Sequence, residues 1–157
     1  MKDTVHTPET DSDFQFAMLP NQVDSLVTPG KNVACVYTYN TLEHALLVLI
    51  KSGYSAVPVL GLHESVYGTV SKTNILEAIL EVDQMNIAKL SETTVEQVAD
   101  TSAPLIKPTV SFQRAIDLLI NRSFLCVVDE QDRFYGLLTR RTVLIEVANQ
   151  LRVHRKN

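Results

Sequence analysis

The chain has 157 residues, 45% of them hydrophobic, which is enough for one compact domain or for two small fused halves. Its formal net charge is −4 and its sequence pI is about 5.5, and it carries no basic stripe or aromatic-interleaved Lys/Arg run, so we expect no nucleic-acid partner. No apolar run reaches membrane-spanning length, and the N-terminus lacks the charged-then-apolar order of a signal peptide. We therefore expect a cytoplasmic protein without a membrane segment.

The cysteine and histidine residues predict neither a disulfide nor a metal site. Cys35 and Cys126 lie in apolar segments without CxxC spacing, so we interpret both as buried, reduced thiols. The four histidines are scattered, and no two of them have metal-ligand spacing. No Ser/His/Asp or Cys/His order and no phosphate-loop glycine pattern stands out, so we expect no catalytic residues, no cofactor and no enzymatic activity.

Short strands and amphipathic helices alternate along the first half of the chain. They follow residues 1–18, which are expected to form a flexible tail. The expected elements are a helix over 21–27, a strand over 33–37, a helix between Thr41 and Gly53, strands over 54–60 and 66–70, and a helix over 72–82. Pro58 has no backbone N–H to donate, so we expect it at an edge or at an end of its strand. Residues 83–94 are expected to continue the last helix and then to turn.

The same order of elements recurs about 70 residues later in the chain. The strand over 124–129 is aligned with the strand over 54–59, and Thr139 corresponds to Ser71 as the cap of the following helix. The apolar helical positions also recur: Leu42, Ala45, Leu46 and Leu49 return as Phe112, Ala115, Ile116 and Leu119. The chain is therefore an internal duplication of a strand–helix–strand–strand–helix unit.

The duplication predicts the fold class. One unit alone can bury only one face of its sheet, so the two units should pack together with pseudo-two-fold symmetry. We predict an α/β fold, arranged as an α+β sandwich of two tandem repeats. The expected boundaries are a tail over 1–18, a first repeat over 19–82, a linker over 83–94, and a second repeat with its C-terminal helix over 95–157.

Two arginines stand where the last helix is expected to begin. Thr139 is a suitable N-cap, so Arg140 and Arg141 fall in the first helical turn, where the helix dipole is positive. Two cations there cost a few tenths of a kcal/mol each unless an anion joins them. Free helix N–H groups, a hydroxyl and two guanidinium groups form an anion site, for which phosphate is the usual occupant. The alternative is a solvated arginine pair on a surface helix.

With this duplicated unit, the chain resembles the CBS-domain pair, the tandem regulatory unit called a Bateman module. The resemblance rests on the helical quartet, on the Ser-Ala-Val-Pro-Val strand at 55–59, and on the paired turns Gly68…Ser71 and Gly136…Thr139. It implies ligand clefts between the two sheets, commonly filled by adenine-containing ligands, and pairing of two chains into a flat homodimer.

More narrowly, residues 41–49, 53–60 and 139–141 are similar to the small stand-alone CBS proteins of Gram-positive bacteria that bind cyclic di-AMP. This resemblance implies that the ligand is cyclic di-AMP and that its binding regulates a partner enzyme, such as a Rel-type alarmone synthetase. It also implies a set of ligand-binding residues: Val33, Ala34, Tyr54, Ser55, Ala56, Val57, Thr139, Arg140 and Arg141.

Two other functions stay open. The first is a CBS pair that senses AMP or ATP, and the second is a scaffold without a ligand, whose arginine pair docks an acidic protein surface. Adenosine-binding CBS sites usually place an Asp three residues beyond the Ser/Thr cap, where it holds the ribose hydroxyls. Here Asn74 and Thr142 stand at those positions, which weighs against AMP, ATP or NAD.

The duplication also predicts a second cleft, related to the first by the pseudo-two-fold axis. Only one cation, Lys72, replaces the arginine pair there, so we expect this cleft to be empty or to bind more weakly. Its corresponding residues are expected to be Ile106, Phe124, Leu125, Ser71, Lys72 and Thr73.

Overall fold

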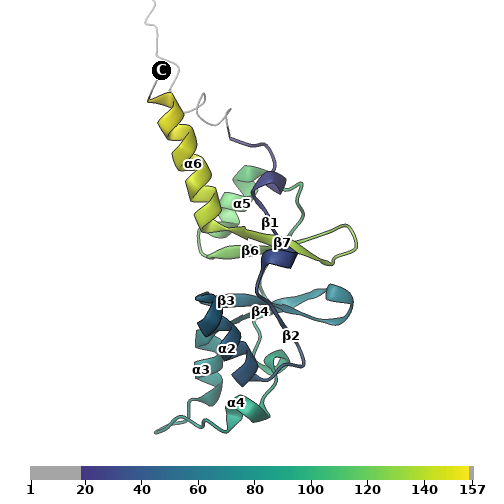
Figure 1. Ribbon diagram of the computed structural model, residues 1–157, viewed down its shortest axis with the longest axis vertical. Coiled ribbons are helices and arrows are strands. Elements are labelled where there is room, and N and C mark those ends of the chain that lie inside the picture. Colours follow the sequence, from purple (N-terminus) through teal and green to yellow (C-terminus); the bar gives the residue numbers. More distant parts are fainter. Residues whose placement is uncertain (1–18, 156–157) are drawn as a thin grey trace, which may run out of the picture.

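The computed structural model describes residues 19–155, apart from the side chain of His154, and the predicted tail over 1–18 lies outside the described residues. Two sheets face each other in the middle of the molecule, and helices lie on their outer sides (Figure 1). The outer helices are α5 (Phe112–Leu119) and α6 (Arg140–His154) on one sheet, and α2 (Leu42–Ser52) and α3 (Lys72–Ile79) on the other. The α/β fold with two packed repeats is therefore as predicted.

The first half is built from short strands around α2 and α3. α2 covers the predicted residues because the Thr41 hydroxyl accepts a hydrogen bond from the His44 N–H at 3.2 Å, and because Gly53 ends the helix with a left-handed φ of 73°. The helix predicted over 21–27 is only a 3-10 turn followed by a short strand. The other elements of this half are η1 (Asp24–Leu26), β1 (Thr28–Pro29), η2 (Gly30–Asn32), β2 (Val36–Tyr37), β3 (Ala56–Leu60), η3 (Leu62–Glu64) and β4 (Val66–Ser71).

The connection between the halves corrects one prediction. α3 ends at Ile79 because Leu80 is extended, with φ −75° and ψ 127°, so the helix does not continue into the connection. The chain then turns back, and the Asn86 N–H donates to the Ile79 carbonyl at 2.8 Å. The Glu81 carboxylate holds this turn through Asn86 at 3.0 Å and Lys89 at 3.3 Å. The elements that follow are α4 (Lys89–Glu92), η4 (Val95–Gln97), β5 (Leu105–Ile106), β6 (Phe124–Val128) and β7 (Phe134–Thr139).

The segment that leads into each repeat crosses to the other half. We call residues 22–34 the first lead-in and residues 94–104 the second lead-in. The sheet orders are β1-β7-β6-β5 and β2-β3-β4, so β1 of the first lead-in belongs to the sheet of the second repeat. There Thr28 lies opposite Leu137, and Val23 is fully buried in the second hydrophobic core.

The second lead-in makes the reciprocal crossing. Its Val95 is fully buried in the first core, and Asp100 forms an antiparallel bridge to β4. Both crossings pass directly over a glycine. A Cβ added to Gly68 would overlap the carbonyl oxygen of Asp100, and a Cβ added to Gly136 would overlap that of Thr28. The paired glycines of the repeat therefore allow two backbones to approach closely.

Pro58 lies in the middle of β3, which is the central strand of its sheet, so the expected place at an edge or at an end is wrong. Thr69, its partner on β4, exchanges both backbone hydrogen bonds with Asp100, at 3.0 and 2.8 Å. The Pro58 nitrogen therefore faces the side of β2, where pairing begins only at Val59. The missing N–H thus removes no bond from the sheet.

The alignment of the two repeats differs from the predicted one at their central strands. Ala56 pairs with the helix cap Ser71, and Phe124 pairs with the equivalent cap Thr139, so Phe124 corresponds to Ala56 and not to Tyr54. The shift arises because α2 has 11 residues and α5 only 8, so the repeat loses residues at the end of the helix, before the strand.

Candidate functional site

A cleft of about 390 Å³ opens between the two sheets, within the range of about 300–1,000 Å³ that is typical of small-molecule sites. Its walls come from the first lead-in, from the starts of β3 and β6, and from the end of β7 with the first turns of α6. The lining residues are Thr28, Val33, Ala34, Tyr54, Ser55, Ala56, Val57, Pro58, Ser123, Phe124, Leu137, Thr139, Arg141, Thr142 and Ile145.

Eight of the nine predicted ligand-binding residues line this cleft. Val33 and Ala34 lie just before β2, Tyr54 and Ser55 lie just before β3, and Ala56 and Val57 are the first two residues of β3. Tyr54 is half exposed, at 50%, so its ring is accessible to a ligand. The remaining predicted residue, Arg140, is not part of the lining.

The first turn of α6 presents a positive charge to the cleft. The Thr139 hydroxyl accepts the Thr142 N–H at 3.1 Å, and the two hydroxyls of these residues lie 2.8 Å apart. This turn contains no acidic residue, and no ion pair within the described residues uses Arg141. A guanidinium and the positive end of a helix are thus available together at one wall of the cleft.

Arg140 has a different role from its neighbour. Its Nε donates to the Arg122 carbonyl at 2.9 Å, and its backbone N–H donates to the Ser123 carbonyl at 2.9 Å. Arg140 therefore braces the start of α6 against the start of β6. Adjacent helical residues point about 100° apart, so only Arg141 lines the cleft, although both arginines border a neighbouring hollow together with Leu144 and Ala148.

Seven lining residues were not predicted, and most belong to contacts between distant segments. Thr28 and Leu137 reach the cleft through the crossing of the first lead-in, which the sequence pattern did not reveal. Ser123 and Phe124 would have followed from the corrected alignment with Ser55 and Ala56. The others are Pro58, Thr142 and Ile145, and helical spacing gave a signal for Ile145, which lies one turn after Arg141.

The pseudo-symmetric second cleft is smaller, about 210 Å³, and Phe124 is the only one of its six predicted residues that lines it. The prediction of Lys72 as its cation is wrong, because Arg122 lines the cleft instead, at the position that Tyr54 has in the first repeat. The lining residues are Ala56, Thr69, Ala103, Pro104, Asn121, Arg122, Ser123, Phe124 and Cys126.

The two thiols lie outside the first cleft. Burial raises the pKa of the Cys126 thiol to about 12, and burial followed by the nearby Glu64 carboxylate raises the pKa of Cys35. Within residues 19–155 no group of three or more Cys, His, Asp or Glu side chains is arranged to hold a metal ion. Every helix in the described part of the chain is too short or too polar to span a bilayer.

Comparisons with known proteins agree with the tandem repeat. The family model for the CBS domain matches residues 23–81 and 95–149. Cyclic di-AMP receptor B of Bacillus subtilis (strain 168) is 34% identical over 135 residues, covering 86% of this chain and 92% of that protein.

Solved structures also share this fold. A CBS domain-containing protein of unknown function from Bacillus anthracis str. Ames Ancestor has a TM-score of 0.80 and 38% identity, covering 86% of this chain and 98% of that one. The CbpB protein of Listeria monocytogenes in complex with c-di-AMP has a TM-score of 0.78 and 37% identity, covering 83% of this chain and 98% of that one. The duplicated strand–helix unit, its two clefts and these matches together show that the chain belongs to the CBS-domain family, as a tandem pair of CBS domains.

Proposed function

We propose that this chain is a cyclic di-AMP receptor that binds the nucleotide in the 390 Å³ cleft between its CBS repeats. The observation that carries the proposal is Arg141, a cation on the first turn of α6 that faces the cleft and has no ion-pair partner within the described residues. The relatives support it, since one is named cyclic di-AMP receptor B and another was solved in complex with c-di-AMP.

The chemistry of the cleft suits a cyclic dinucleotide. The Arg141 guanidinium provides donors for phosphate oxygens and can bind them in a bidentate way, and the positive end of the α6 dipole adds to the attraction. The apolar walls around Ala34 and Val57 suit the faces of the two adenine bases.

Among residues 19–155 no Asp or Glu lines the cleft, so a free ribose diol finds no carboxylate acceptor in this part of the chain. Asn74, at the position where an Asp would be expected in the first repeat, is occupied with its helix cap: its side-chain oxygen accepts from the Ser71 N–H at 3.0 Å. These features favour a 3′,5′-linked ligand over AMP or ATP.

The proposed receptor has no reaction of its own and regulates a partner enzyme, such as a Rel-type alarmone synthetase, in the cytoplasm. It would act as a homodimer. Uncovered apolar side chains support both kinds of contact: Leu144 and Ile145 are 60% and 47% exposed beside the cleft, and Val82 is 99% exposed on the connection between the halves. A ligand that changes the affinity for the partner must have its own affinity changed by the same factor.

Isothermal titration calorimetry tests the ligand directly. The purified full chain is titrated with cyclic di-AMP, and cyclic di-GMP, AMP and ATP serve as comparators. We expect saturable heat with cyclic di-AMP and little with the others. At a hundredfold excess over the Kd, the ligand should also add about 2.7 kcal/mol to the free energy of unfolding. Preferential binding of ATP or AMP would establish the alternative nucleotide sensor, and no binding by any nucleotide would establish the scaffold.

The regulatory part needs a separate measurement. Immobilised receptor is exposed to a purified Rel-type synthetase with and without saturating cyclic di-AMP, and binding is recorded by biolayer interferometry. We expect the synthetase to bind the free receptor and to dissociate when the nucleotide is added. Equal binding under both conditions would contradict ligand-gated regulation of this enzyme and leave the nucleotide-binding proposal intact.

A further inference from the structure

Ala56 and Phe124 occupy equivalent places in the two repeats. Each is the first residue of its central strand, and each pairs with the residue that caps the next helix. The residues before them, Ser55 and Ser123, are also equivalent. The Ser55 carbonyl accepts the N–H of the first residue of α3 at 3.1 Å, and the Ser123 carbonyl accepts the N–H of the first residue of α6 at 2.9 Å. A methyl group in one repeat thus corresponds to a phenyl ring in the other.

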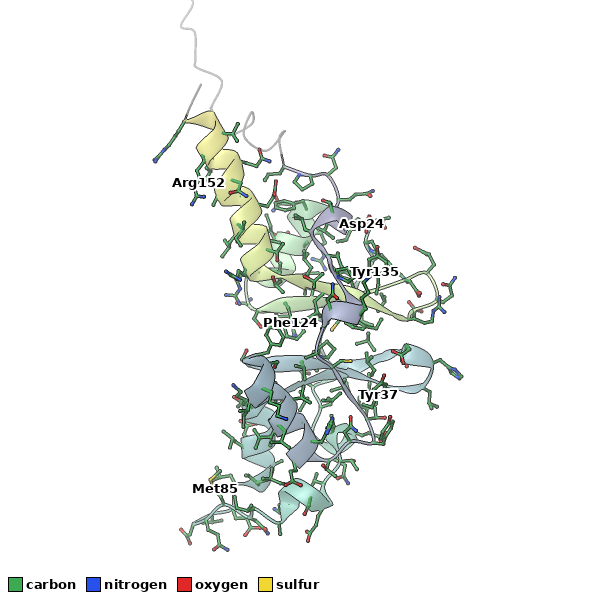
Figure 2. The ribbon with its side chains drawn as sticks, in the orientation of Figure 1. Asp24, Tyr37, Met85, Phe124, Tyr135 and Arg152 are labelled. Carbon is green, nitrogen blue, oxygen red and sulfur yellow. The ribbon has the colours of Figure 1, made fainter. Side chains whose placement is uncertain are left out.

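Both residues border both clefts, because they lie where the two strand starts approach the pseudo-two-fold axis. Figure 2 shows Phe124 between the two sheets. In the first cleft the strand of the same repeat contributes Ala56, and the ring of Phe124 forms the wall from the opposite repeat. In the second cleft the ring is contributed by the strand of that cleft itself.

The cleft sizes follow this difference. The cleft with Ala56 on its own strand has about 390 Å³, and the cleft with Phe124 on its own strand has about 210 Å³. Ligand clefts usually have about 300–1,000 Å³, so only the first has room for a molecule with two nucleotides.

The ring also has a favourable place in the first cleft. Phe124 is opposite Thr139 on β7, next to the turn that carries Arg141, so an aromatic face borders the cleft near the cation. Nucleobases stack on such faces, because purines and aromatic side chains are both flat, apolar and polarisable. A ligand whose phosphate is held by Arg141 would then have an adenine base within reach of the ring.

We propose that Phe124 is a specificity-determining residue: its ring stacks on one base of the cyclic dinucleotide in the first cleft, and the same ring keeps the second cleft too small for such a ligand. This inference rests on the proposed function, because it assumes that a cyclic dinucleotide binds between the repeats. One side chain thus both contacts the base in the first cleft and excludes the dinucleotide from the second cleft.

Tryptophan fluorescence gives a direct test of stacking, because the chain contains no Trp. The variant Phe124→Trp therefore carries a single emitter in the cleft. We expect cyclic di-AMP to quench its emission, with the same Kd that calorimetry gives for this variant. Tyr39→Trp is the matched control: Tyr39 is 71% exposed, lies outside both cleft linings and should show no change. Unquenched emission from a Phe124→Trp variant that binds the ligand would overturn the stacking.

A substitution series separates the ring from simple apolar bulk. Phe124→Tyr should keep wild-type affinity, and Phe124→Leu should lose about tenfold although it stays apolar. A purely structural role would lower the melting temperature of Phe124→Leu without a difference in ligand affinity between the two variants. Equal affinity of the Leu and Tyr variants would contradict stacking.

Two measurements test the exclusion from the second cleft. Calorimetry of the wild-type chain should give one cyclic di-AMP per chain at saturation, and two would overturn the inference. Ala56→Phe places the same ring on the strand of the first cleft and should weaken binding at least a hundredfold, with a circular dichroism spectrum like that of the wild type. If Ala56→Phe binds normally, ring size does not decide which cleft is used. If the wild-type chain binds no cyclic di-AMP at all, the proposed function itself fails, so the two failures are distinguishable.

Discussion

The two clefts are built on the same scaffold, but they differ at the few positions that a ligand would contact. Tyr54 is replaced by Arg122, and Ala56 is replaced by Phe124. In the first cleft the strand of the same repeat begins with the small Ala56, and the cation is Arg141 on the first turn of α6. In the second cleft the strand begins with the large Phe124, and the cation is Arg122, which lies just before β6. A duplication thus gives two copies of one scaffold, and substitutions at the strand starts and helix ends make the two clefts differ in size and in the position of their positive charge.

The helix ends next to the clefts differ as well. At α3 the Ser71 hydroxyl accepts the Asn74 N–H at 3.0 Å, and the Asn74 side-chain oxygen accepts back from the Ser71 N–H at 3.0 Å. This reciprocal capping box occupies the polar groups of that helix start. At α6 Thr142 carries only a hydroxyl, and the adjacent Arg141 extends into the cleft. The first and third N–H groups of both helices are already bonded, so it is the Arg141 guanidinium that makes the α6 end the better anion site.

The largest expected effect is the difference in ligand affinity between variants of Arg141 and Arg140. Arg141→Met should weaken cyclic di-AMP binding about a hundredfold, since hydrogen bonds to charged groups contribute about 1.5–3 kcal/mol. Arg140→Met should weaken it much less, because that guanidinium is bonded to the Arg122 carbonyl. Calorimetry measures both, and thermal melts check the fold. Lys72→Met, in the other repeat, is the control and should bind normally. An Arg140→Met variant as defective as Arg141→Met would contradict the different roles of the two arginines.

The glycines under the two crossings offer the next contrast. Gly136→Ala and Gly68→Ala should each lower the free energy of unfolding by about 1–3 kcal/mol, because the added methyl overlaps a backbone carbonyl. Urea titrations measure these losses. Only Gly136→Ala should also weaken cyclic di-AMP binding, since the first lead-in continues from Thr28 to the cleft wall at Ala34. A similar loss of ligand affinity in Gly68→Ala would show that the lead-ins do not act on separate clefts.

The helix caps should have a smaller effect. Ser71→Ala and Thr139→Ala should each cost about 1 kcal/mol of stability, the usual value for an N-cap. We expect the larger loss at Ser71, because its substitution also breaks the capping box with Asn74. Melting curves with and without cyclic di-AMP then separate stability from binding. Thr139→Ala should reduce the stabilisation by the ligand, and Ser71→Ala should leave it unchanged; the reverse result would contradict binding of the ligand at the start of α6.

The smallest effect concerns the two thiols. The pKa of Cys126 is raised by burial from an ordinary 9.0 to about 12, so the folded chain favours the protonated thiol. This contribution to stability is present below pH 9 and is lost as the pH rises towards 12. In native protein at pH 8, Ellman's reagent should label Cys35 slowly and Cys126 more slowly still, whereas both react at once in denaturant. Fast labelling that persists in Cys35→Ser would show that Cys126 is accessible.

Much of the fold followed from local patterns. Helical spacing together with the Thr41 cap and Gly53 defined α2, and the recurrence of these signals about 70 residues later predicted the pairing of two similar halves. Eight of the nine predicted site residues then proved to line one cleft. Such features are predictable because caps, turns and apolar stripes depend on residues close together in the sequence.

Other features were not accessible in this way. The strand alignment was displaced because α5 is shorter than α2, and a helix can lose residues without changing its apolar stripe. Pro58 could be accepted in a central strand only because β2 begins beside Val59. The separation of Arg140 from Arg141 depended on where the Arg122 carbonyl lies. Each outcome depends on a partner that is distant in the sequence.

The sequence by itself thus determined the duplicated unit, its main helices and the positive helix end that marks the candidate site. The tertiary structure decided how the halves interlock, which arginine lines the cleft and which of the two clefts is the larger. The physical reason is the range of the interactions involved. Caps and periodicity act over a few residues, whereas the crossing of Thr28 over Gly136 and the place of Phe124 beside Ala56 exist only when residues about 70 or more positions apart are packed together.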